Sequence, residues 1–151
     1  MHRFIGLLFA VCLLGAVSVQ AGPARILKVL PHLLDQQGRH TLAPSLFERD
    51  AYQAKLRKNP DDVSALRFDV QWKRGSTKDA RLRMRVEVRG GKAGAKPLLI
   101  EEKAEFKGLF TAWSDLKISR EEYLSLGGVS AWRASLWDGD TLLSDVKSFL
   151  W

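Results

Sequence analysis

The sequence has almost no cysteine. Its one Cys12 lies in an apolar N-terminal stretch, and residues 22–151 contain none. This part of the chain can form no disulfide and offers neither a thiol nucleophile nor a thiolate metal ligand. We therefore expect the fold to be stabilised by a hydrophobic core rather than by covalent links.

Recognisable catalytic motifs are also missing. The sequence has no Gly-x-Ser-x-Gly elbow, phosphate-binding loop, His-Glu-x-x-His helix or dinucleotide fingerprint. Its acidic doublets fall in strand-like segments or turns, and neighbouring residues on one strand point to opposite faces, so a doublet is not a catalytic carboxylate pair. The sequence predicts a non-catalytic protein without a cofactor.

The N-terminus has the three parts of a secretory signal peptide. Arg3 supplies the positive start, a nearly continuous apolar run follows, and Val19 and Ala21 occupy the positions that a signal peptidase reads. We expect residues 1–21 to be cleaved and the protein to be periplasmic or secreted. Retention of the run as an N-terminal anchor stays open, although it is shorter than the ~20 residues of a spanning helix. No later stretch predicts a membrane span.

Residues 22–151 predict a single domain, long enough to bury a core. The formal charge of +7 becomes +6 after cleavage, because Arg3 leaves and no acid does. A positive balance favours anionic neighbours such as envelope polymers or lipid head groups. The acidic and basic residues are nevertheless well mixed, which is typical of ordinary surface.

One helix is expected near residues 45–58. Ser45 and Glu48 have the spacing of a capping box, basic residues gather toward the C-terminal end, and Asn59-Pro60 ends the segment. Phe47 is expected on a side of the helix that packs against the body of the protein.

The rest of the chain alternates like half-buried strands. Six or seven short strands are separated by turns about every 8–12 residues, which predicts a mainly β antiparallel β-sandwich of immunoglobulin-like or fibronectin-like architecture. The C-terminal part predicts a hairpin with a three-residue loop at 138–140, which sets Trp132 opposite Val146. The expected strands are 26–30, 65–72, 81–89, 98–107, 109–119 and the two arms of the hairpin in 129–151.

An arginine ladder runs along "RLRMRVEVRG", residues 81–90. Its arginines alternate with apolar residues and are a candidate anion-binding face. We favour a plainer interpretation, in which the ladder is a solvated face paired with the charges of the next strand, with Arg85 opposite Glu101 or, in a shifted register, Arg89 opposite Glu101. Nucleic acid is not expected, because no exposed aromatic residues are interleaved. The ladder residues are Arg81, Arg83, Arg85 and Arg89.

Trp113 and Trp137 share their strand phases with polar residues, Arg133 among the neighbours of Trp137. Exposed tryptophan beside polar groups is typical of surfaces that stack on sugar rings or hold a partner. These three residues are the candidate ligand-binding set. The alternative is that both rings pack under loops or under the helix.

The two histidines of residues 22–151 flank a predicted turn at 35–38. If the turn forms a hairpin, His32, Asp35 and His40 approach one another. They are weak candidates for a metal site, since a site needs three or four convergent ligands and the usual spacings are missing.

These patterns lead to one expectation and two alternatives. We expect an exported non-catalytic interaction or accessory module whose partner is an unidentified protein or an envelope polysaccharide. The first alternative is a carbohydrate-binding module that uses the tryptophans, and the second is an enzyme of unrecognised type built around His32, Asp35 and His40. Strand addition at the edge of 26–30 or at the C-terminal strand is a further binding mode.

Overall fold

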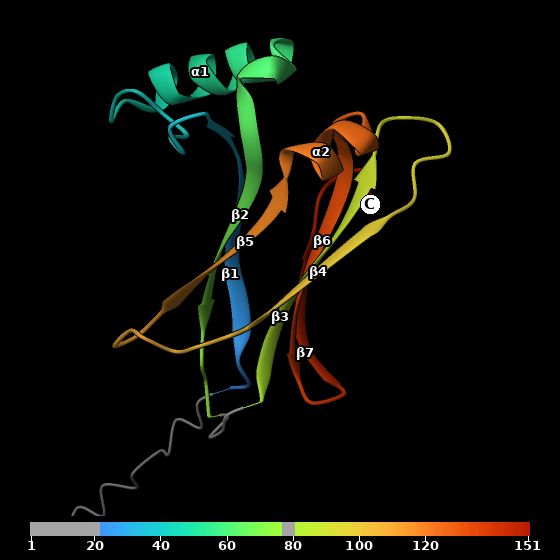
Figure 1. Ribbon diagram of the computed structural model, residues 1–151. Coiled ribbons are helices and arrows are strands. Elements are labelled where there is room, and N and C mark those ends of the chain that lie inside the picture. The colour runs from blue at the N-terminus through green and yellow to red at the C-terminus, as the bar shows by residue number, and fades with distance from the viewer. Residues whose placement is uncertain (1–21, 77–80) are drawn as a thin grey trace, which may run out of the picture.

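The computed structural model describes residues 22–76 and 81–151, so the predicted signal peptide lies outside the described residues (Figure 1). The fold is mainly β, with two antiparallel sheets of three and four strands, as the alternation predicts. None of the helices in the described part of the chain is long and apolar enough to cross a membrane. The elements are β1 (Arg25–Asp35), α1 (Leu46–Lys58), the short 3-10 helix η1 (Pro60–Asp62), β2 (Val63–Lys73), β3 (Leu82–Gly90), β4 (Leu98–Lys103), β5 (Ala112–Ser119), α2 (Arg120–Leu126), β6 (Val129–Asp138) and β7 (Thr141–Lys147).

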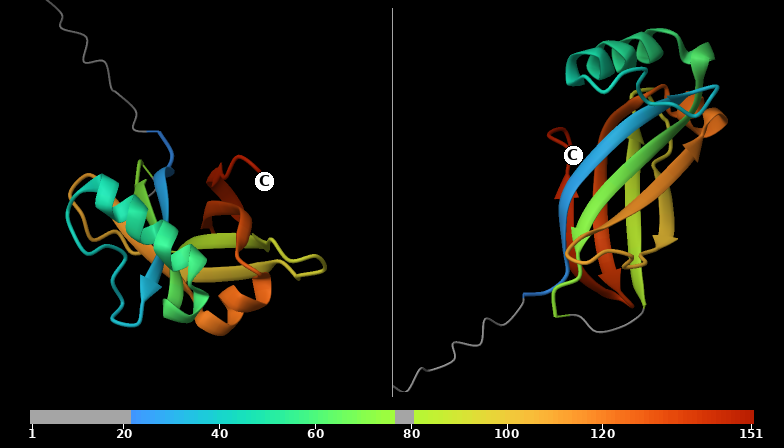
Figure 2. Two further views of the ribbon diagram at one scale, coloured as in Figure 1. Left: turned by 90° about the horizontal axis from the view of Figure 1, so that it is seen from above. Right: turned by 90° about the vertical axis from the view of Figure 1, so that its left-hand side faces the viewer.

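The strands are ordered β1-β2-β5 in one sheet and β4-β3-β6-β7 in the other. The two sheets stand side by side, and α1 lies across one end of them (Figure 2). One hydrophobic core takes side chains from both sheets. The alternation in β2 is as predicted, since Leu66, Phe68, Val70 and Trp72 are all buried.

The predicted pairing of the arginine strand is confirmed. Arg85 lies opposite Glu101 and Arg83 opposite Lys103 in the β3–β4 ladder, which excludes the shifted register. The inward positions of β3 are almost completely buried. Burial of one face fixes the register, because a slip by one residue would turn that face to water.

The C-terminal hairpin forms, but its predicted register is wrong. The turn has two residues, Gly139 and Asp140, and Gly139 takes a positive φ of 56°. A register shift between Leu136 and Trp137 then changes the pairing by one residue, so Val146 lies opposite Ala134 rather than Trp132. A bulge of this kind leaves no mark in the hydrophobic alternation.

Helix α1 has the predicted bounds, but its predicted capping box is wrong. Ser45 is the N-cap residue, and its side chain makes no capping hydrogen bond. Phe47 is 82% exposed, and the buried residues of the helix are Gln53 and Leu56. The packed side of α1 is therefore set by a polar residue, which hydrophobic periodicity cannot predict.

A complete capping box does form at α2. The Ser119 hydroxyl accepts from the Glu122 N–H at 3.2 Å, and the Glu122 carboxylate accepts from the Ser119 N–H at 2.8 Å. The helix ends at Gly127, whose φ of 66° suits glycine. This short helix joins β5 to β6 and carries the chain from one sheet to the other.

Gln53 of α1 satisfies the backbone of the edge strand β1. Its amide oxygen accepts from the Leu33 N–H at 2.8 Å, and its amide nitrogen donates to the Leu33 carbonyl at 2.9 Å. The same nitrogen also donates to the His40 carbonyl at 2.8 Å. The Gln53 amide thus takes the place of a neighbouring strand at this point of the edge.

The rest of the β1 edge is also poorly suited to an incoming strand. Pro31 has no N–H to offer, and the Ile26 N–H donates to the Ser144 hydroxyl of β7 at 3.1 Å. Such devices are common in proteins that avoid edge-to-edge association. Strand addition at β1, one of the binding modes suggested by the sequence, has little free backbone to use.

We predict that Gln53→Leu lowers the free energy of unfolding by about 2 kcal/mol or more, because the substitution leaves buried backbone groups of β1 without partners. The measurement is urea denaturation followed by tryptophan fluorescence. The control is Gln37→Leu at an exposed position, where a change within about 0.5 kcal/mol is expected. Equal losses in the two variants would contradict the role given to Gln53.

Candidate functional site

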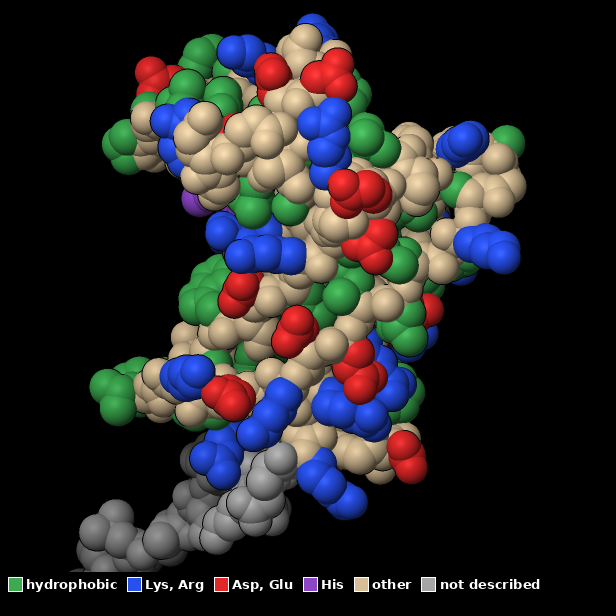
Figure 3. Space-filling model, viewed as in Figure 1, with side chains coloured by type: hydrophobic (Ala, Val, Ile, Leu, Met, Phe, Trp, Pro, Cys, Tyr) green, Lys and Arg blue, Asp and Glu red, His purple; other side chains and the backbone are tan. Residues whose placement is uncertain are grey.

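An open hollow of about 550 Å³ lies beneath α1 on the outer face of the three-stranded sheet. A histidine shows in the notch under the helix, above a group of basic side chains (Figure 3). The hollow brings together three of the residues singled out in the sequence, His32, His40 and Trp113. Its full lining is Leu30, His32, His40, Arg49, Arg67, Asp69, Trp113 and Asp115.

Strand pairing places these side chains in rows across the sheet. Leu30 of β1 lies opposite Asp69 of β2, which lies opposite Asp115 of β5. In the adjacent rows, His32 lies opposite Arg67, and Trp113 lies opposite Gln71. Because alternate residues of β2 and β5 fill the core, the residues between them are forced to this outer face.

Asp69 is the centre of the polar network in the hollow. It accepts from His32 Nδ1 at 3.1 Å and from Arg67 Nη2 at 2.9 Å. Burial raises the pKa of the Asp69 carboxyl, but the hydrogen bonds from His32 and Arg67 outweigh it and the net pKa is lowered. Asp69 is thus held as a carboxylate that fixes the orientation of the His32 ring and the Arg67 guanidinium.

His40 covers His32 from the loop that follows β1. The two rings are stacked, with centroids 4.5 Å apart and an interplanar angle of 22°. Burial lowers the pKa of His40, and the charges of His32 and Arg67 lower it further. His40 is therefore neutral near pH 7 and adds a flat, weakly polar surface above His32.

Trp113 is 51% exposed and forms one wall of the hollow. Trp113 also lines a second hollow of about 280 Å³ beside the loop between β4 and β5. The two hollows share Trp113 and Asp115, and we refer to them together as the Trp113 groove. The second hollow is lined by Glu102, Lys103, Glu105, Lys107, Trp113, Ser114 and Asp115.

Asp35 does not join His32 and His40. Its carboxylate accepts from the Gln37 N–H, the Arg39 N–H, the Arg39 guanidinium and the Tyr52 hydroxyl, at 2.7–2.9 Å. Asp35 therefore organises the turn after β1. The described residues hold no group of three or more His, Cys, Asp or Glu arranged to bind a metal.

Trp137 and Arg133 lie elsewhere, on β6 of the four-stranded sheet. The Arg85 guanidinium lies 4.6 Å from the centroid of the Trp137 ring, and the indole N–H donates to Ser135 at 2.8 Å. Arg133 donates to Asp145 at 3.0 Å. Trp113 and Trp137 therefore belong to different sheets and do not form one aromatic platform.

The arginine ladder is largely engaged in contacts within the protein. Arg83 and Arg85 both pair with Glu101, whose pKa is lowered chiefly by the hydrogen bond from Arg85. The Arg89 guanidinium lies 3.9 Å from the centroid of the Trp151 ring. Arg81 is exposed beside Gly139 at the end of the ladder. These contacts favour the interpretation of the ladder as a paired outer face.

Several residues of the Trp113 groove were not predicted from the sequence, namely Arg49, Arg67, Asp69 and Asp115. The alternation in β2 does place Arg67 and Asp69 on the outer face. What the sequence lacks is the information that β5 lies beside β2, since β3 and β4 separate them in the chain. Without that neighbour, Trp113 has no visible connection to Asp69 or to the histidines.

The chain matches no protein-family model, no curated protein and no solved structure. Function is therefore argued from the chemistry of the site.

We predict a pH-dependent contribution of Asp35 to stability. Burial raises the pKa of this carboxyl, but the hydrogen bonds from Arg39, Tyr52 and Gln37 together lower it from 3.8 to about 2. A carboxyl with a depressed folded-state pKa stabilises the fold above its unfolded pKa, and that contribution disappears as the pH falls from about 4 to about 2. The shift corresponds to at most about 2 kcal/mol.

The measurement is the free energy of unfolding of the wild type and of Asp35→Asn between pH 5 and pH 2. The variant is expected to be less stable at pH 5 and to lose less stability on acidification. Asp62→Asn, at an exposed position, serves as the control and should follow the wild type. If the free energy of unfolding of Asp35→Asn fell with pH as steeply as that of the wild type, this carboxyl would not be what holds the turn.

Proposed function

We propose that the protein is an exported, non-catalytic binding module of the periplasm or cell envelope, and that it binds a glycan in the Trp113 groove. The observation that carries the proposal is a half-exposed tryptophan ring on a rigid strand, between two hollows lined by charged and polar side chains. An aromatic face beside carboxylates, guanidinium and imidazole suits a sugar ring, which presents an apolar face and a rim of hydroxyls.

The polar groups of the groove include both acceptors and donors. Asp115 is exposed and lines both hollows, so its carboxylate can accept hydrogen bonds from sugar hydroxyls in either one. Arg67 and His32 are oriented by Asp69, which reduces the conformational entropy lost on binding. The two hollows lie toward α1 and toward the loop between β4 and β5, so a ligand that fills both must contain several linked sugar units.

We also propose a more specific fold class for the two sheets. The first, second and fifth strands share one sheet, and the other sheet has the order fourth, third, sixth, seventh. This order supports a β-sandwich of fibronectin-like arrangement, with α1 and α2 added between strands. Sandwiches of this kind are common scaffolds for binding surfaces on exported proteins.

The proposed location rests on the N-terminal sequence pattern, and the proposed partner rests on the groove. A polysaccharide of the envelope is the partner we favour, and an unidentified protein partner is the alternative. Nucleic acid is disfavoured, because the groove offers one exposed aromatic ring and a mixture of charges rather than a basic channel.

Catalysis by an enzyme of unrecognised type has one feature in its favour, the hydrogen bond between His32 and Asp69. Such a pair orients an imidazole as a general base in many hydrolases. The lining of the hollow contains no serine, threonine or cysteine beside His32 that such a base would activate. The non-catalytic proposal is therefore preferred.

We predict that Trp113→Ala weakens glycan binding by at least about 30-fold, the loss expected for an aromatic anchor of about 2 kcal/mol. The probes are a glycan array and purified peptidoglycan sacculi, with bound protein measured after sedimentation. Trp137→Ala is the matched control, because this tryptophan lies on the other sheet and lines neither hollow.

Three results would overturn parts of the proposal. Failure of the wild type to bind any probe would remove the glycan assignment. Equal losses in the two tryptophan variants, with both folded by circular dichroism, would remove the groove as the site. Release of reducing ends by the wild type but not by Asp69→Asn would replace the binding module by an enzyme.

A further inference from the structure

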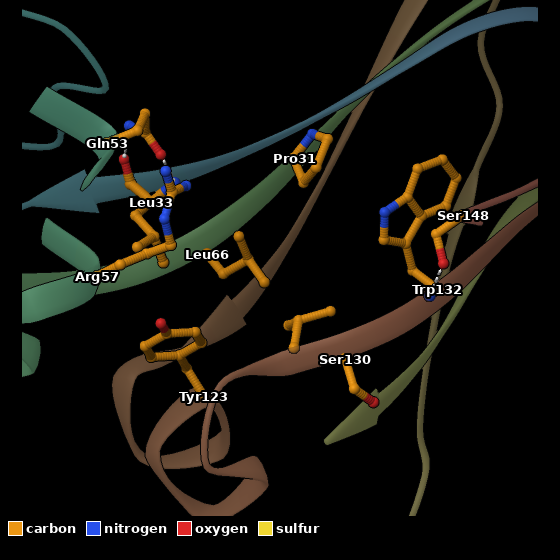
Figure 4. A pocket seen from close by; sticks show the side chains of 10 residues that line it. Pro31, Leu33, Gln53, Arg57, Leu66, Tyr123, Ser130, Trp132 and Ser148 are labelled. Carbon is orange, nitrogen blue, oxygen red and sulfur yellow. Dashed lines mark hydrogen bonds between the residues drawn. The ribbon is translucent and has the colours of Figure 1, made fainter. Parts of the chain in front are cut away.

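A further cavity, of about 210 Å³, lies on the inner face of the three-stranded sheet, between the ends of the two sheets (Figure 4). None of its lining residues lines the Trp113 groove. We refer to it as the Tyr123 cavity. It is lined by Pro31, Leu33, Gln53, Arg57, Leu66, Tyr123, Val129, Ser130, Trp132 and Ser148.

The walls of the Tyr123 cavity are apolar. Leu33 and Leu66 come from the three-stranded sheet, and Val129 and Trp132 come from the start of β6. The ring of Pro31 lies above the space between them (Figure 4). These walls favour an apolar occupant in this part of the cavity, because water beside them finds few hydrogen-bond partners.

Three polar groups at the cavity have no hydrogen-bond partner among the described residues, and each of them can donate. They are the Tyr123 hydroxyl, the Trp132 indole N–H and the Arg57 guanidinium. Tyr123 is only 7% exposed. Figure 4 shows its hydroxyl directed toward β1 and β2, and the indole nitrogen of Trp132 turned toward the same space.

The other polar lining residues are already engaged. Both ends of the Gln53 amide bond the backbone of Leu33, the Ser148 hydroxyl accepts from the Trp132 backbone N–H at 2.9 Å, and Ser130 donates to backbone carbonyls. The lining contains no carboxylate. Unused donors and no unused anionic acceptor make the cavity complementary to an oxygen-bearing anion.

Arg57 and Tyr123 act at the same end of the cavity. Burial raises the pKa of the Tyr123 hydroxyl, and the nearby positive charge of Arg57 acts in the opposite direction. The hydroxyl therefore stays protonated at neutral pH and remains a donor. The guanidinium and the phenol thus form an anion-binding end of the cavity, and the rest of the cavity is apolar.

We propose that the Tyr123 cavity binds a small carboxylate with an apolar body, such as a short fatty acid. The carboxylate lies between Arg57 and the Tyr123 hydroxyl, and the apolar body lies against Leu33, Val129 and Trp132. Cavities of about 150 Å³ in apolar cores accommodate a benzene ring, so this space suits a short acyl chain or one ring. The site is independent of the glycan groove in both residues and ligand chemistry.

The test is an NMR titration of the mature protein with octanoate, following the indole N–H resonances, with octanol and octylamine as probes of the head group. The five tryptophan signals are assigned with single Trp→Phe variants. We expect octanoate to shift the Trp132 indole signal in a saturable manner, and octanol and octylamine to bind at least about 10-fold more weakly.

Two variants address the anion-binding end. Arg57→Gln and Tyr123→Phe are each expected to weaken octanoate binding, by about 10-fold or more for the arginine. Lys58→Gln is the matched control, because it removes a neighbouring charge of α1 that does not line the cavity. Urea denaturation of each variant establishes that the fold is retained.

The proposal fails if octanoate leaves the Trp132 signal unshifted at millimolar concentration. Equal affinities for octanoate and octanol would overturn the assignment of the anion-binding end. A response confined to Trp113 would place the ligand in the groove instead. A failure of glycan binding would not affect the octanoate result, since the glycan test depends on Trp113 and the octanoate test on Trp132.

Discussion

The hydrogen bonds of Gln53 are the interaction on which both proposed sites depend. One buried amide group satisfies the N–H and the carbonyl of Leu33 and also holds the carbonyl of His40. It therefore docks α1 against an edge strand and draws the loop after β1 under the helix. Without this docking, α1 would be held by Leu56, a few partly buried side chains and the Tyr52–Asp35 hydrogen bond. The roof of the Trp113 groove and one wall of the Tyr123 cavity both belong to α1.

A second set of bonds supports the first. Asp35 ends β1 and ties the following turn to Tyr52 of α1 through a hydrogen bond of 2.7 Å. Gln53 and Tyr52 are adjacent in the helix, so their hydrogen bonds to His40 and Asp35 hold one turn of α1 to two points of the same segment. The Gln53 bond to the His40 carbonyl holds the loop where the His40 ring stacks on His32. Asp35 thus affects the groove without lining it.

The sequence predicts well what depends on burial and poorly what depends on contacts between distant segments. The alternation in β2 and β3 predicts which side chains are inside. Cross-strand charge matching predicts two registers for β3 and β4, and the structure has the one with Arg85 opposite Glu101. The capping box expected at Ser45 is absent and the one at Ser119 is present, although the two spacings look alike. Trp113 and Trp137 look equivalent in sequence, yet they lie on different sheets, because the chain changes sheet between β5 and β6. Asp69 meets His32 only after β1 and β2 pair, which no local pattern shows.

The two sites share a wall but should act independently. Coupling would require α1 to have two positions that the two ligands favour differently. Any second position would break all three hydrogen bonds of Gln53 and bury unsatisfied backbone groups, at a cost of about 1–3 kcal/mol for each group. In the proposed complexes, a short carboxylate makes one charged contact with α1, through Arg57, and a glycan reaches the helix only at Arg49. Neither contact is large enough to offset that cost, so α1 stays fixed over one end of the three-stranded sheet, which separates the polar groove on its outer face from the apolar cavity on its inner face.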